Sequence, residues 1–167
     1  MNFSQADLDE LIVCSKRVTD PPRRELKVES GYERNDFRLE SLDGVHQFQA
    51  FFRRNERFPE NFSLGLDYLP VDGVRFPLVR VNGPHGDFNR SFDPSHPHSD
   101  THVHRMSAED LAAGIMKPRL ATVSREYASF EQAIPYFLNL VKVMDAGLHF
   151  ERYLQLELPL DEPEAAS

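Results

Sequence analysis

The chain has 167 residues, 40% of them hydrophobic, with a single cysteine and a formal net charge of −8. This length suffices to bury one hydrophobic core without disulfides or structural metals, and a lone cysteine excludes an internal disulfide. The acidic balance disfavours a nucleic-acid-binding protein, although the acidic excess is concentrated at the two ends of the chain. No apolar stretch approaches membrane-spanning length and the first residues lack a signal-peptide pattern, so we expect a cytoplasmic protein.

The first predicted element is a helix over residues 5–17. Ser4 and Asp7 have the spacing of a capping box with an acidic partner. Leu8 and Ile12 recur on one helical face behind it. The two prolines of TDPPRR end the helix, because proline cannot continue one.

A β-hairpin is predicted over residues 36–52, in two runs of alternating apolar and polar residues around Asp43-Gly44. This dipeptide suits a two-residue type I′ turn. Such a turn places Leu39 opposite Phe48 and leaves one face of the hairpin apolar and the other polar.

Further strands are predicted over residues 61–69, 74–83 and 101–106. Pro77 lies within the second of them and indicates an edge or a bulge, because proline cannot donate to the ladder. A C-terminal helix over residues 129–145 follows.

Together these elements predict an α+β fold, with an antiparallel meander of about five strands flanked by an N-terminal and a C-terminal helix on one sheet face. We expect one domain over residues 1–158 and an acidic disordered tail over residues 159–167.

Five of the seven histidines fall between Val81 and Arg105. The period of two in THVHR places His102 and His104 on the same face of a strand. His85 would lie near them if residues 75–82 and 101–106 pair in the sheet. The other two, His96 and His98, lie in a segment rich in Pro, Asp and Ser, which fixes side chains less firmly than a strand does.

Three interpretations of this segment are open. The histidines could bind a metal, with Asp100 or His98 as a further ligand, but their spacing matches no zinc motif. They could cleave RNA without a metal or cofactor, because one imidazole accepts a proton while another donates one near neutral pH. Finally, the segment could be a polar loop of a protein-interaction module without catalytic activity, with Arg53 and Arg54 as its contact surface.

For the ribonuclease interpretation we predict two sets of residues. Acid and base catalysis is assigned to three histidines: His85, His102 and His104. Binding of the phosphate is assigned to three arginines: Arg80, Arg90 and Arg105.

The order of these parts over residues 30–142 resembles the TumE-type bacterial toxin components. The motif residues that carry the resemblance are Asn82, Pro84 and His85 in one turn, then His102 and His104. The chain also resembles an uncharacterised bacterial family with a Pro-His turn and a His-x-His strand.

The TumE resemblance implies a toxin that acts on RNA and is blocked by a cognate antitoxin or regulatory protein covering the histidine face. We therefore expect the toxin component of a toxin–antitoxin pair, with RNA as substrate and no membrane partner. The alternative is a metal-binding or protein-interaction module.

Overall fold

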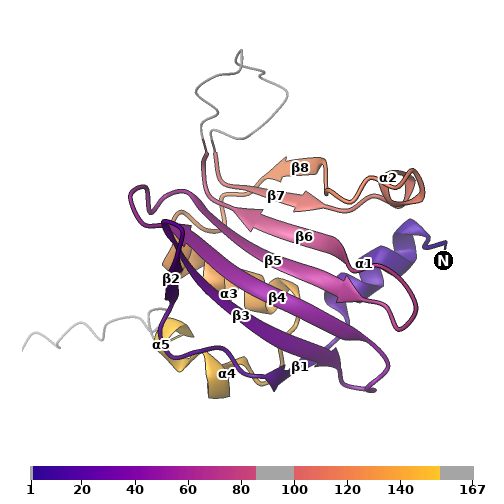
Figure 1. Cartoon of the computed structure of the whole chain (residues 1–167), viewed down its shortest axis with the longest axis horizontal. Helices are drawn as coiled ribbons and strands as arrows, with labels where there is room; N and C mark the ends of the chain where they lie inside the picture. The colour runs from indigo at the N-terminus through magenta and orange to yellow at the C-terminus, as the bar shows by residue number, and fades with distance from the viewer. Residues whose placement is uncertain (1, 86–99, 155–167) are drawn as a thin grey trace, which may run out of the picture.

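The computed structural model describes residues 2–85 and 100–154, and folds them into an antiparallel sheet with helices packed on one face (Figure 1). The eight described strands are Lys16–Asp20 (β1), Lys27–Glu29 (β2), Tyr32–Ser41 (β3), Gln47–Asn55 (β4), Phe62–Leu69 (β5), Phe76–Asn82 (β6), His102–Arg105 (β7) and Leu120–Val123 (β8). The described helices are Gln5–Val13 (α1), Ala108–Ala112 (α2), Phe130–Leu140 (α3), Ala146–His149 (α4) and Glu151–Leu154 (α5).

The predicted α+β class with an antiparallel meander is confirmed, but the sheet is larger than the five strands expected. The expected strands are β3 to β7, and each pairs with the next along the chain. β1 and β2 both pair with β3, and β8 extends the sheet beyond β7. The two expected helices are α1 and α3, both shorter than predicted. The predicted tail, residues 159–167, lies outside the described residues.

The predicted start of α1 is confirmed and its predicted end is wrong. The hydroxyl of Ser4 accepts from the backbone N–H of Asp7, whose carboxylate accepts from the N–H of Ser4. The helix ends at Val13 because the chain then turns into β1, which pairs with β3.

Lys16, the first residue of β1, is fully buried. Its Nζ donates to the backbone oxygens of Ile12 and Cys14, both at 2.8 Å, and of Val141 at 3.1 Å. These oxygens lie at the ends of α1 and α3, where carbonyls lack a partner within the helix. Burial lowers the pKa of Lys16 to about 8.

The register predicted for the hairpin is confirmed, with Leu39 opposite Phe48, but the turn differs. Only Gly44 has a positive φ, of 75°, whereas a type I′ turn needs two such residues. The Gly44 N–H donates to Ser41 O at 2.8 Å. The carboxylate of Asp43 accepts from the Ser41 hydroxyl and from the Val45 N–H, which stabilises this alternative turn.

Pro77 lies at a bulge, as its residue type indicated. The pairing of β5 with β6 shifts by one residue between Leu66, opposite Val79, and Asp67, opposite Pro77. The extra residue, Leu78, is fully buried. The bulge therefore accommodates a residue without an N–H inside the sheet.

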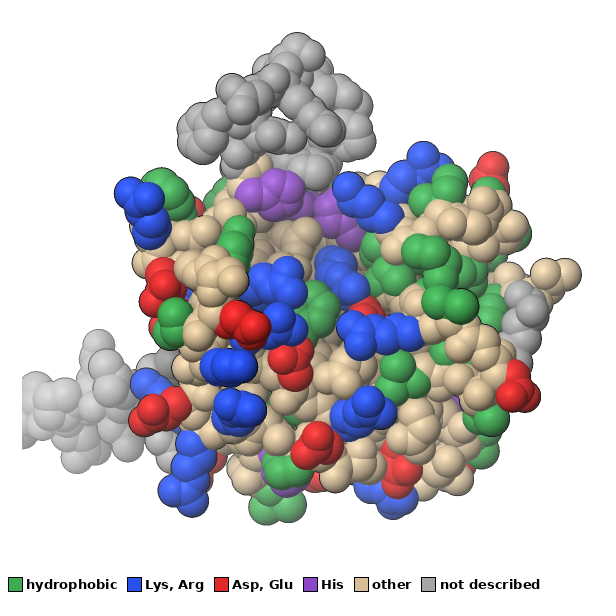
Figure 2. Space-filling model, viewed as in Figure 1, with side chains coloured by type: hydrophobic (Ala, Val, Ile, Leu, Met, Phe, Trp, Pro, Cys, Tyr) green, Lys and Arg blue, Asp and Glu red, His purple; other side chains and the backbone are tan. Residues whose placement is uncertain are grey.

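The two faces of the sheet differ sharply. The covered face, which packs on α1 and α3, carries the apolar side chains Phe37, Leu39, Phe48, Phe52, Leu64, Leu66, Val81 and Val103, all at most 5% exposed. The open face carries the alternate residues of the same strands, which are mostly charged or polar, and it is the face turned to the viewer in Figures 1 and 2. None of the helices within the described ranges is long and apolar enough to cross a membrane.

Candidate functional site

Strands β6 and β7 bring two histidines to the open face. In their antiparallel register His102 lies opposite Asn82, and His104 lies opposite Arg80. Val103 lies between the two histidines and points to the covered face, where it is 5% exposed. The alternation predicted from the sequence therefore places both imidazoles on one side of β7.

His85 joins them through the turn that follows β6. The N–H of Gly83 donates to Phe62 O at 3.0 Å, and a Cβ at Gly83 would lie 2.1 Å from Glu60 O. Glycine is therefore required for this close approach of two backbone segments. The turn places the His85 ring 5.0 Å from the His102 ring, between centroids.

The three imidazoles form a continuous row. The His102 ring lies 4.8 Å from the His104 ring, and both ring pairs in the row meet edge to face, at 62° and 80°. His102 is fully buried and His104 is 9% exposed. His85 is half-buried and so is the member of the row most open to solvent.

Hydrogen bonds fix the middle ring of this row. The Nδ1 of His102 lies 2.8 Å from the carbonyl of Asp100, which can only accept, so Nδ1 carries the proton. Its Nε2 faces the amide nitrogen of Asn82 at 3.4 Å, and the Asn82 amide oxygen accepts from the Ser63 hydroxyl at 2.7 Å. These contacts hold the His102 ring in one orientation.

Tyr127 ties β6 to β7 at the end where the histidines lie. Its hydroxyl lies 2.9 Å from the backbone oxygens of both Asn82 and His102, on the covered side. Burial raises the pKa of Tyr127, so this hydroxyl stays protonated and remains a donor. Tyr127 therefore fixes the backbone of β6 and β7 from the covered face of the sheet.

The three arginines predicted to bind phosphate have different environments. Arg80 lies beside the row, but its guanidinium donates to Asp67 at 2.5 Å and to the backbone oxygens of Leu66 and Val79. Burial lowers the pKa of Arg80, and the charge of Asp67 opposes that effect. Its donors are thus directed into the sheet.

Arg105 lies on the other side of the sheet from the histidines, contrary to the expectation that it shares their site. It pairs with Val79, a fully buried residue of the covered face, because the period of two turns every second side chain of β7 away. Arg90, His96 and His98 lie outside the described residues.

An aromatic and arginine cluster on the open face was missed by sequence reasoning. The Phe51 ring has the guanidinium carbon of Arg80 at 4.8 Å from its centroid and that of Arg53 at 5.4 Å. Arg53 also lies 6.0 Å from the ring centroid of Tyr32. The hairpin register could have found the cluster, because it places Phe51 and Arg53 on the polar face of β4.

Metal binding by the row finds no support in the described ranges. No group of three or more His, Cys, Asp or Glu side chains there has an arrangement that could hold a metal ion. A tetrahedral zinc site needs three or four ligands that converge on one point.

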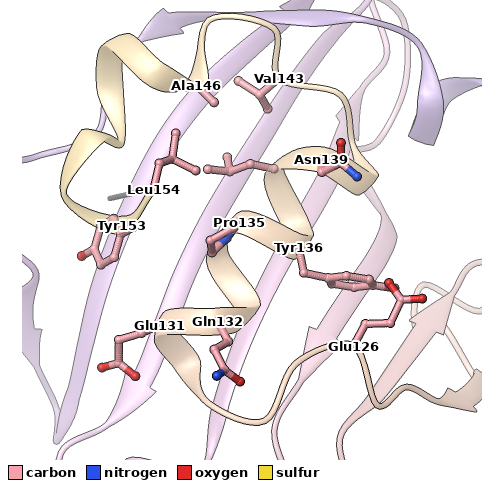
Figure 3. Close-up of a pocket in the computed structure, with 11 residues that line it drawn as sticks. Glu126, Glu131, Gln132, Pro135, Tyr136, Asn139, Val143, Ala146, Tyr153 and Leu154 are labelled. Carbon is pink, nitrogen blue, oxygen red and sulfur yellow. The ribbon is translucent and has the colours of Figure 1, made fainter. Parts of the chain in front are cut away.

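A cavity of about 700 Å³ lies among the helices (Figure 3). Its wall includes Tyr136 and Asn139 of α3 and Tyr153 of α5. It is polar in part, but it contains no histidine and no arginine.

Comparisons with protein-family models, with curated proteins and with solved structures find no match to this chain.

Proposed function

We propose that the chain is the toxin component of a bacterial toxin–antitoxin pair and that it cleaves RNA without a metal. The observation that carries the proposal is the row of His85, His102 and His104 on a sheet face that also presents arginines. Two imidazoles in different protonation states are the minimal equipment for cleavage at a ribose 2′-hydroxyl.

The surroundings of each ring suggest its role. His102 is held by Asp100 and Asn82 and is fully buried, so we assign it to positioning its neighbours. Proton transfer is assigned to His85 and His104, which flank it. Arg80 is assigned a supporting role beside His104, because its hydrogen bonds go to Asp67 and the backbone.

The proposed reaction is a transesterification. One imidazole takes the proton of the 2′-hydroxyl as the oxygen attacks phosphorus, and the bond to the 5′-oxygen breaks. The other imidazolium protonates that leaving oxygen, so the products are a 2′,3′-cyclic phosphate and a 5′-hydroxyl, and no redox partner is required.

The test is cleavage of a labelled single-stranded RNA in the presence of EDTA. We expect His85→Ala and His104→Ala to lower the rate by about 100-fold or more, and the products to carry cyclic phosphate ends. Arg105→Ala, on the opposite face of β7, is the matched control and should retain full activity. Cleavage that EDTA abolishes, or that survives both histidine substitutions, would contradict the proposal.

The toxin role rests on the family resemblance and is tested in cells. Expression of the chain should arrest bacterial growth, and co-expression of the neighbouring gene should relieve the arrest. His104→Ala should be harmless while Arg105→Ala remains toxic. A chain that is monomeric and harmless when expressed alone would remove the reason for proposing an antitoxin partner over the histidine face.

A further inference from the structure

Phe51 forms a flat platform in the middle of the open face. A Cβ at Gly65, directly opposite on β5, would lie 2.4 and 2.5 Å from Cε1 and Cζ of the Phe51 ring. The ring therefore lies across the glycine and covers the neighbouring strand instead of pointing into solvent. The ring is half-buried, and the guanidinium carbons of Arg80 and Arg53 lie 4.8 and 5.4 Å from its centroid, so a base that stacks here also contacts these cations.

The platform and the histidine row belong to the same cross-strand rows. Phe51, Gly65, Arg80 and His104 are successive partners across β4, β5, β6 and β7. Arg53, Ser63, Asn82 and His102 form the adjacent row. In each row three strand spacings separate the β4 residue from the β7 residue, a distance of about 14 Å. A short extended ligand can span it.

The charge of this region is opposite to that of the chain as a whole. Figure 2 shows Lys and Arg side chains gathered over the sheet next to the histidines, in a chain with a net charge of −8. Arg34 is paired with Asp36, and Arg75 with Asp67. Arg53, by contrast, is exposed and forms no ion pair within the described residues. Of the two arginines beside Phe51, it is the one that can meet an external anion, because Arg80 is paired with Asp67.

We infer that single-stranded RNA lies across the open face, with a base stacked on Phe51 and a phosphate on Arg53, and leads from there to the histidine row. The inference rests on the proposed function and names where its substrate binds. A single strand fits best, because only unpaired bases can stack on an aromatic ring, whereas a duplex keeps its bases inside.

The experiment measures binding separately from cleavage. A fluorescent 12-nucleotide RNA with 2′-O-methyl groups throughout cannot be cleaved by the proposed reaction, so its affinity for the full chain can be measured by anisotropy over a range of salt concentrations. Three variants are compared with the parent chain: Phe51→Leu, which keeps the apolar volume without the ring, Arg53→Ala, and Arg152→Ala. The last removes an exposed arginine from α5, on the covered side of the sheet.

Phe51→Leu should weaken binding about tenfold with an unchanged salt dependence. Arg53→Ala should weaken it and lower the slope of log affinity against log salt by about 0.7. Arg152→Ala should bind like the parent. Equal affinity for all four proteins, or tighter binding of a duplex than of the single strand, would overturn the inference even if the unmodified RNA is cleaved. Loss of cleavage alone would count against the proposed function only.

Discussion

Two consecutive residues of β4 show how differently the two sheet faces are used. Phe52 points to the covered face and is fully buried. Its ring centroid lies 5.1, 6.0 and 5.6 Å from those of Phe37, Phe137 and Phe150. Phe51 points to the open face, where its ring lies across Gly65 and two guanidinium groups lie near its centroid. Phenylalanine thus packs in the core at one position and beside charged groups on the surface at the next.

The same division runs through β7. Val103 packs into the core, while His102 and His104 face the other way. Because the covered face alone supplies an apolar core for the sheet, the charged and aromatic residues of the open face are available for binding. We therefore predict that substitutions on the covered face lower the free energy of unfolding and that those on the open face lower the proposed activity.

The largest effect should come from Phe52→Ala. Removing a fully buried aromatic ring leaves a cavity, so the free energy of unfolding should fall by about 3–5 kcal/mol, as measured by urea denaturation. Phe51→Ala is the matched variant and should lose about 1 kcal/mol or less. Equal losses for the two would break the distinction between the faces.

Gly83→Ala should have the next largest effect, because its Cβ would lie 2.1 Å from a backbone oxygen, that of Glu60. Relief of this clash requires backbone movement at a cost of about 1–3 kcal/mol. We expect the movement to displace His85 and so to lower the proposed RNA cleavage as well. Gly147→Ala, where a Cβ meets nothing within 4 Å, is the control. Unchanged stability of the Gly83 variant would show that the turn adapts freely.

Lys16→Met should lower the free energy of unfolding at neutral pH by about 1 kcal/mol, because three backbone oxygens lose their donor. The parent chain should also respond to pH. With a folded pKa of about 8 against an ordinary 10.5, the folded protein releases this proton at a pH where the unfolded chain still binds it. Stability should therefore rise with pH across that window. Persistence of the same rise in Lys16→Met would assign it to other groups.

Sequence reasoning located the elements with strong alternation. The hairpin register and the shared face of His102 and His104 followed from the period of two, which the structure keeps. The strands β2 and β8 were not predicted, because their residues are mostly exposed and show little apolar alternation. Their strand conformation comes from pairing with β3 and β7, which only the fold reveals.

The candidate site was foreseen in part for the same reason. The position of His85 beside the other two histidines depends on the pairing of β6 with β7. The sequence alone could not show that these two strands pair. Sequence proximity also grouped Arg53 with Arg54. The structure separates them, since Arg54 pairs with Glu33 and Glu131 on the covered side. Adjacent residues of a strand point to opposite sheet faces, so Arg53 and Arg54 do not belong to one contact surface.

Locating bound RNA on the protein would test the proposed binding face. A uridine-rich single strand is crosslinked to the chain with ultraviolet light, and the modified peptides are identified by mass spectrometry. We expect crosslinks on the open face, at Phe51 and Tyr32 and near the histidine row. Crosslinks confined to the cavity among the helices, at Tyr136 or Tyr153, would contradict it.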